Sequence, residues 1–128
     1  MIHIENDEAF PVLAILGEVD LASVEQLNAS LLACASAPVL VVSLERAEFI
    51  DSTVLESLIR CHGSRNGRLV IVLPEGSRVF RLFKVTNLVD YFSLAGSRSE
   101  AFQRAATLRD LAAASFSRDG VKTPQARS

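Results

Sequence analysis

The sequence lacks most features of membrane, secreted and metal-binding proteins. No apolar run approaches the roughly 18 residues that a membrane-spanning helix needs. The start, MIHIENDEAF, has no basic region followed by an apolar stretch, so we expect no signal peptide. The only two cysteines, Cys34 and Cys61, lack the paired spacing of a zinc site and suit a reducing compartment. We therefore expect buried thiols, no metal or other cofactor, and a cytoplasmic protein.

The chain also has little excess charge of either sign. Its 13 lysines and arginines stand against 15 acidic residues, for a formal net charge of −2. Such a balance provides no strong field toward nucleic acid or an anionic membrane, and neither is an expected partner. By contrast, 49% of the 128 residues are hydrophobic, which is ample for the packed core of one domain.

Apolar runs alternate with helical patterns along residues 1–114. The continuous runs VLVVSL (39–44) and RLVIVL (68–73) predict strands that are buried on both faces, as in a parallel sheet. The order is β-β-α-β-α-β-α-β-α, which predicts a single α/β domain with a mixed, mostly parallel sheet of four or five strands. Residues 115–128 are poor in apolar side chains, and we expect a flexible tail. The other predicted elements are strands over 2–4, 12–16 and 91–94 and helices over 24–36, 53–65, 76–86 and 98–114.

Three helix starts fit the capping-box pattern, in which a hydroxyl residue and a Glu or Gln three residues later satisfy the first backbone N–H groups. The predicted pairs are Ser23 with Gln26, Thr53 with Glu56, and Ser97 with Glu100.

Two loops that follow strands contain the candidate functional residues. One is the turn GEVD (17–20), and the other lies within EFIDSTVLESL (48–58). Because the carboxyl ends of parallel strands meet at one edge of a sheet, we expect Asp20 and Asp51 to lie near Ser52. Thr53 is the expected cap of the following helix, and Ser52 and Asp51 are the alternative caps.

Ser52 has a second interpretation, as a phosphorylation site. A phosphoryl group there would lie at a helix N-terminus, where backbone N–H groups and the helix dipole accommodate negative charge. It would add about −1.5 to −2 charge at pH 7 on a surface that a partner could contact. The residues alone favour the cap over the phosphorylation site and leave both open.

No catalytic group accompanies Ser52. Of the two histidines, His3 belongs to an expected edge strand and His62 lies roughly 15 Å from the helix start at 1.5 Å per residue. A serine nucleophile needs a positioned base. The sequence also lacks G-x-S-x-G, G-x-G-x-x-G and the Walker pattern. We expect no catalytic residues and no enzyme.

Three sequence blocks, in this order, resemble the STAS domain family. They are LGEVDLASVEQL, VVSLERAEFIDSTVLESLIR and RLVIVLPEGSRVFRLFKVTNLVDYFSL, and the resemblance spans residues 2–112. Within the family the chain resembles the bacterial anti-anti-sigma factors, or anti-sigma factor antagonists. This resemblance implies a mixed sheet with helices mostly on one side. It also implies a regulator that binds an anti-sigma factor serine kinase, is released when phosphorylated, and is reset by a serine phosphatase.

The resemblance also implies roles for single residues. Ser52 matches the phosphorylated serine, with Thr53 as the alternative acceptor. The implied partner-binding residues are Glu18, Asp20, Asp51, Ser52, Thr53 and Val54. Val54 departs from the family pattern, which usually has glycine at this position, and its branched side chain is expected to alter the fit of the partner or to weaken the switch.

Two other functions remain open from the sequence. The first is a STAS accessory subunit of a membrane transport assembly, which needs no phosphate cycle. The second is a nucleotide or small-molecule sensor, because Arg78, Arg81 and Lys84 could attract phosphate, although no glycine-rich loop is present to hold it. The sequence is compatible with a monomer or a weak dimer.

Overall fold

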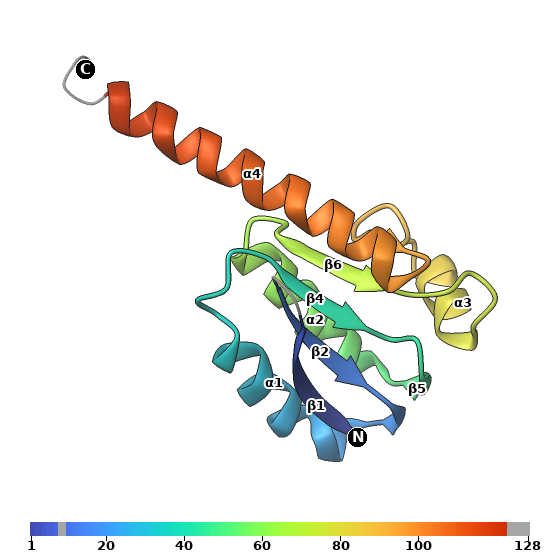
Figure 1. The fold of residues 1–128 in the computed structure, drawn as a ribbon. Helices are drawn as coiled ribbons and strands as arrows, with labels where there is room; N and C mark the ends of the chain where they lie inside the picture. Colours follow the sequence, from blue (N-terminus) through green and yellow to red (C-terminus); the bar gives the residue numbers. More distant parts are fainter. Residues whose placement is uncertain (8–9, 123–128) are drawn as a thin grey trace.

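A five-stranded sheet runs through the centre of the computed structural model, which describes residues 1–7 and 10–122 (Figure 1). Its first two strands are antiparallel, and all the other neighbours are parallel. This confirms the predicted mixed, mostly parallel sheet. The strand order is β1-β2-β4-β6-β7, with β1 at Ile2–Asp7, β2 at Phe10–Ile15, β4 at Leu40–Ser43, β6 at Leu69–Val72 and β7 at Ser93–Ala95.

The central strands β4 and β6 are buried on both faces, as their continuous apolar sequences predicted. Every residue of both strands is buried. Val42 and Ile71 belong to the apolar cluster on one face, whereas Val41 and Val70 belong to the cluster on the other. A strand pair of this kind requires helices on both sides of the sheet.

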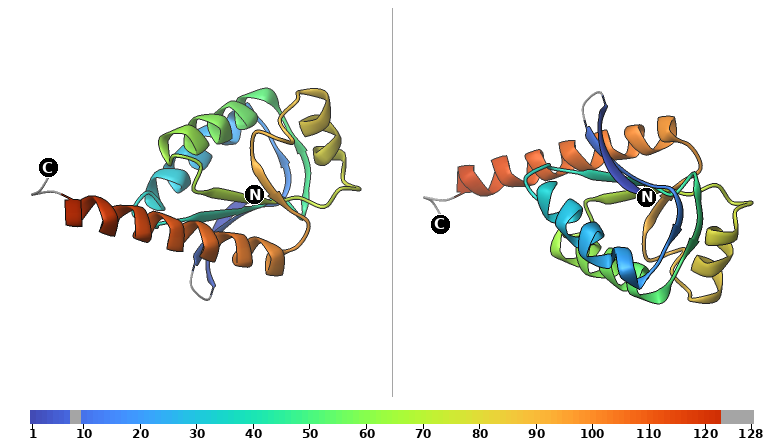
Figure 2. Two further views of the ribbon diagram at one scale, coloured as in Figure 1. Left: turned by 90° about the horizontal axis from the view of Figure 1, so that it is seen from above. Right: turned by 90° about the horizontal axis from the view of Figure 1, so that it is seen from below.

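The helices form two unequal layers (Figure 2). Side chains of α1, α2 and α3 complete the larger apolar cluster, whereas Ala101 and Ala105 of α4 complete the smaller one. Helices therefore lie mostly on one side of the sheet, as expected. Their bounds are α1 at Val24–Ala33, α2 at Ser52–Ser64, α3 at Arg78–Val85 and α4 at Arg98–Lys122.

Two short strands were not predicted. Gly17–Val19 (β3) and Ala47–Ile50 (β5) pair in parallel and form a separate two-stranded sheet. The sequence predicts a turn at the first and a loop at the second, because three or four residues are too few for a clear alternation of apolar and polar side chains. Their pairing places the segments that follow them side by side.

The predicted capping box before α1 is wrong. Ser23 makes no side-chain cap, because a 3₁₀ turn, η1 (Leu21–Ser23), precedes the helix and is capped by Asp20. Gln26 does not reach back to Ser23. Its amide instead donates to the carbonyl of Ile2 at 3.4 Å.

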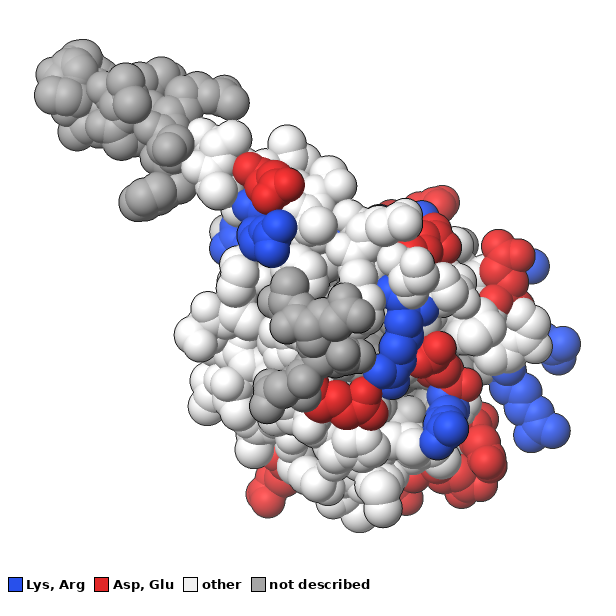
Figure 3. Space-filling model, viewed as in Figure 1, with Lys and Arg blue, Asp and Glu red and all other residues white. Residues whose placement is uncertain are grey.

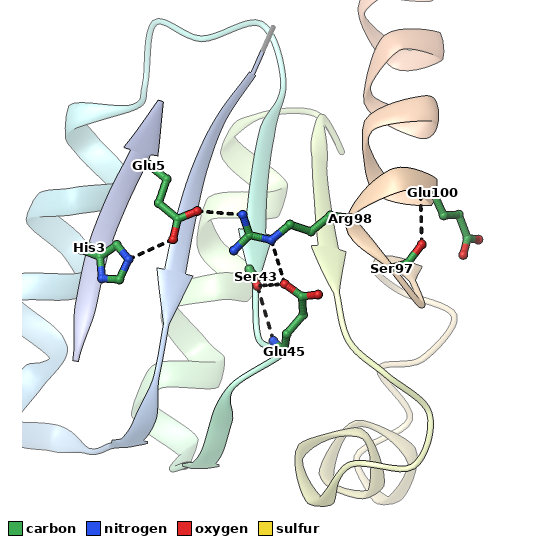
Figure 4. Close-up of polar contacts among 7 residues, drawn as sticks. All are labelled: His3, Glu5, Ser43, Glu45, Ser97, Arg98 and Glu100. Atoms are coloured by element: carbon green, nitrogen blue, oxygen red, sulfur yellow. Dashed lines mark hydrogen bonds and ion pairs between the residues drawn. The ribbon is translucent and has the colours of Figure 1, made fainter. Parts of the chain in front are cut away.

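The first turn of α4 is fixed by polar contacts (Figure 4). The hydroxyl of Ser97 accepts a hydrogen bond from the N–H of Glu100 at 3.2 Å, which confirms this half of the predicted capping box. Arg98 joins Glu5 on β1 at 2.7 Å to Glu45 after β4 at 2.8 Å. The two carboxylates raise the pKa of Arg98, whereas the contact with Arg98 lowers the pKa of Glu5.

The helix α4 is longer than predicted. Its backbone continues to Lys122, so the helix end predicted at about Ala114 is wrong. The remainder of the predicted tail, residues 123–128, lies outside the described residues. Within the described part of the chain, no helix is long and apolar enough to cross a membrane, and no group of three His, Cys, Asp or Glu residues could hold a metal ion.

Arg65, just after α2, is a buried charge that the sequence did not reveal. The residue is only 8% exposed. Its guanidinium donates to the carbonyls of Cys34 at 3.2 Å, Ala37 at 2.5 Å and Arg68 at 3.0 Å. Arg65 therefore ties the segment after α1 to the loop between α2 and β6, and burial lowers its pKa.

We expect Arg65→Met to lower the free energy of unfolding by about 2–4 kcal/mol, because three carbonyl groups lose a charged donor in a buried place. Urea denaturation would measure the change. The control is Arg60→Met, which replaces an exposed arginine of α2 and should change stability by less than about 0.5 kcal/mol. Equal losses in the two variants would contradict a structural role for the Arg65 hydrogen bonds.

Candidate functional site

The two candidate loops begin next to each other because β3 and β5 are paired. Val19 and Ile50, the last residues of these strands, are partners in the register, so Asp20 and Asp51 both leave the same edge. The N–H of Asp51 donates to the carbonyl of Val19 at 3.4 Å and extends the pairing by one bond. The structure thus brings the two loops together at one edge, as their positions in the sequence predict.

Asp51 is the N-cap of α2, which confirms one of the two alternative caps, whereas the first expectation, Thr53, is wrong. Asp51 has an extended backbone (φ −95°, ψ 179°), so the helix begins at Ser52. Its Oδ1 atom accepts the backbone N–H of Thr53 at 3.1 Å and of Val54 at 3.2 Å. These are the donors that an N-cap is expected to satisfy.

The same carboxylate also binds a side chain of α2. The hydroxyl of Thr53 donates to Oδ1 of Asp51 at 2.5 Å. This bond, with smaller contributions from the backbone N–H groups of Val54, Thr53 and Leu21, lowers the pKa of Asp51. All three hydrogen bonds to Oδ1 come from the first turn of α2, so the carboxylate fixes the start of this helix.

The two hydroxyl residues after Asp51 have different surroundings. Ser52 is exposed, and its hydroxyl has no hydrogen-bond partner among the residues that the structure describes. Thr53 is half-buried, and its hydroxyl is bound to Asp51. Ser52 is therefore the more accessible of the two hydroxyl groups.

Val54 lies in the core and not on the candidate surface. Its side chain is 0% exposed and belongs to the larger apolar cluster. The expectation that its side chain contacts a partner is corrected, because this position of the first turn of α2 faces the sheet. The valine side chain, which is larger than the glycine implied by the family resemblance, is accommodated within the core.

The remaining predicted residues form an acidic edge around Ser52. Glu18 on β3 and Asp20 after it are both exposed, and Asp20 also caps η1 by accepting the N–H of Ala22 at 3.1 Å. Two exposed apolar side chains near this edge were not predicted, Leu21 with 68% and Phe49 with 51% exposure. The sequence contains only one indication that Phe49 is part of this surface. It is an aromatic residue on the outer face of a strand that is too short to be recognised from sequence.

A cavity of about 510 Å³ lies between β5 and α3, next to the acidic edge. We call it the β5–α3 groove. Its lining residues are Glu18, Glu48, Phe49, Ile50, Arg78, Val79 and Leu82.

Residues 2–95 match the family model described as "Mlab, STAS domain". The comparison with curated proteins finds no match. Among solved structures, an anti-sigma factor antagonist from Mycobacterium paratuberculosis is similar at 22% identity and a TM-score of 0.74, with 83% of this chain and 93% of that chain covered.

Two further solved structures are similar in fold. The Bacillus cell fate determinant SpoIIAA in its phosphorylated form has 21% identity and a TM-score of 0.60, with 81% of this chain and 98% of that chain covered. A sulfate transporter family protein from Wolinella succinogenes has 17% identity and a TM-score of 0.64, with 80% of this chain and 88% of that chain covered. At these identities the likeness is one of fold.

Replacing Asp51 tests its role as the cap. We expect Asp51→Ala to lower the melting temperature at pH 7, because α2 loses its cap and the hydroxyl of Thr53 loses its acceptor. Asp51→Asn keeps an acceptor oxygen at this position and should lower it less.

The effect of Asp51 should depend on pH. Because the pKa of Asp51 is lowered by folding, its stabilising effect is complete above the unfolded pKa of about 3.9 and is lost as the pH falls through the folded value. The difference in melting temperature between the wild type and Asp51→Asn should therefore shrink below about pH 4. A difference that stays constant from pH 7 to pH 3 would contradict a role for the charged carboxylate.

Proposed function

The chain belongs to the STAS domain family, and we propose that it is an anti-sigma factor antagonist that works by partner switching. In this proposal the unphosphorylated protein binds an anti-sigma factor that is also a serine kinase. Phosphorylation on Ser52 releases that partner, and a serine phosphatase restores the binding form. The protein acts in the cytoplasm and by association, not by catalysis.

The observation that carries the proposal is the exposed hydroxyl of Ser52 at the first position of α2. A kinase must reach its acceptor oxygen, and Ser52 is accessible on the same edge as Glu18 and Asp20. The similar fold of SpoIIAA, of which a phosphorylated form is known, supports this assignment.

The histidines support a non-enzymatic role. The ring of His62 packs against those of Tyr91 at 4.7 Å and Phe92 at 5.3 Å between centroids, and burial lowers its pKa. His3 lies on β1, where it contacts Glu5 at 2.9 Å. Neither histidine contacts Ser52 in the described part of the chain, so the serine has no neighbouring imidazole base.

Thr53 is the alternative phosphate acceptor. Its hydroxyl donates to the Asp51 carboxylate. For Thr53 to be phosphorylated, this hydrogen bond must break and the half-buried side chain must turn outward. Ser52 needs neither change.

Intact-mass measurement tests the proposal and separates the two acceptors. The protein is incubated with ATP and, in turn, with each anti-sigma factor kinase of its source organism. We expect one phosphate on the wild type and on Thr53→Val, and none on Ser52→Ala. Phosphate on Ser52→Ala that is absent from Thr53→Val would assign the switch to Thr53. No phosphate with any of these kinases would contradict partner switching.

A second function is favoured by a different observation. The fold is also similar to that of a sulfate transporter family protein. In addition, the buried Val54 occupies the position two residues after Ser52 where the anti-sigma factor antagonists usually have glycine. The alternative is a STAS accessory subunit of a membrane transport assembly, docked without a phosphate cycle.

The variant Ser52→Glu distinguishes the two functions. Under partner switching, the added negative charge should weaken binding to the anti-sigma factor by about tenfold or more, since it places a carboxylate within the contact. Ser52→Gln is the matched neutral control and should retain binding. A permanent complex with a transport subunit that both variants leave intact would favour the alternative. Surface plasmon resonance with purified partners measures both cases.

A further inference from the structure

We propose that the β5–α3 groove is a docking site for an amphipathic segment of the anti-sigma partner. In this arrangement the segment places an apolar side chain in the groove, a basic residue against Glu18 and Glu48, and an acidic residue against Arg78. The inference rests on the proposed function for the identity of the partner. The groove would be a second contact region beside Ser52, and phosphorylation of Ser52 does not by itself require it.

The groove has a preformed apolar floor and an exposed aromatic rim. Ile50 and Val79 lie at its base with 1% and 2% of their surface exposed, and Leu82 is half-buried beside them. Phe49, on the outer face of β5, remains 51% exposed. Phenylalanine and arginine are enriched at the centres of protein interfaces, and this groove offers both.

The charges of the groove are divided between its two walls. Glu18 on β3 and Glu48 on β5 are exposed on one side, and Arg78 at the start of α3 is exposed on the other. None of the three forms a salt bridge with a described residue. In Figure 3, acidic and basic side chains project next to each other over the region of β5 and α3.

This division selects the chemistry of the occupant. A purely anionic ligand, such as a nucleotide, meets repulsion from Glu18 and Glu48, and a purely cationic one meets repulsion from Arg78. A peptide segment with an apolar residue between charges of opposite sign complements both walls and the floor. Charge complementarity therefore favours a protein segment over a small ion.

The position of the groove connects it to the switch. Ile50 lines the groove, and the next two residues along the chain are the helix cap Asp51 and the exposed Ser52. A kinase whose active site reaches Ser52 therefore covers surface next to Phe49. The groove can supply affinity from residues that the phosphate does not modify.

Binding of the anti-sigma factor kinase to surface variants tests the proposal. Phe49→Ala removes the aromatic rim, and Arg78→Glu reverses the charge of one wall. Both residues are exposed, so both variants should fold, which circular dichroism checks. We expect each to weaken binding by about tenfold or more in surface plasmon resonance.

The matched controls lie outside the groove. Leu32→Ala removes an apolar side chain of α1 that is 75% exposed, and Arg81→Glu reverses an exposed charge on α3 that does not line the cavity. Both should change binding less than about twofold. Glu48→Lys, with Glu75→Lys as its control, repeats the comparison for the acidic wall.

The outcomes separate this inference from the proposed function. If the kinase binds the wild type and all groove variants equally, the groove proposal fails while partner switching stands. If no kinase binds or phosphorylates the wild type, both fail. A dimer of the chain that dissociates in Phe49→Ala would assign the groove to a second copy and overturn the proposal.

Discussion

The burial of β4 and β6 on both faces is the constraint on which the architecture depends. Two adjacent parallel strands without a solvent-facing side need helices on both faces of the sheet. Here α1, α2 and α3 pack on one face and α4 packs on the other. Parallel connections then place the segments after the strands at one edge. The separate pair of β3 and β5 then places Ser52, the first residue of α2, beside the loop that begins at Asp20.

Within that edge, one carboxylate performs several structural roles. Asp51 accepts the backbone N–H groups of Thr53 and Val54 and also binds the hydroxyl of Thr53. An uncapped helix start would leave several backbone donors unsatisfied. Because Asp51 satisfies them, the two hydroxyl residues are not both needed as caps. Ser52 is left free at the surface, and its hydroxyl can serve recognition.

Patterns with many apolar residues were predictable, whereas short or polar features were not. The runs 39–44 and 68–73 gave the central strands, because each contains enough β-branched residues to exclude a helix. The strands β3 and β5 were missed because their stability comes from pairing with each other, which leaves little trace in three or four residues.

The three helix starts show the same limit. All fit one capping pattern, yet only Ser97 caps as predicted. At α2 the upstream Asp51 takes the N–H groups that the hydroxyl was expected to bind, whereas at α1 an unpredicted 3₁₀ turn capped by Asp20 precedes the helix and Ser23 makes no side-chain cap. The segment of the candidate loops was found from sequence, but Phe49 and the groove depend on α3, which is distant along the chain.

The occupied helix N-terminus determines what a phosphate on Ser52 can do. The N–H groups of Thr53 and Val54, which would otherwise receive it, are already bound to Asp51. A phosphate that took these donors would have to displace Asp51 and thereby also release the hydroxyl of Thr53. Repulsion between the phosphate and the Asp51 carboxylate favours the other arrangement, in which the phosphate points away from the helix. Under the proposed partner switching, a phosphate on Ser52 would therefore change the surface charge at the contact with the partner and leave the fold in place. In such a switch, the binding free energy from the groove must be small enough that the repulsion caused by one phosphate, with a charge of about −2, can release the partner.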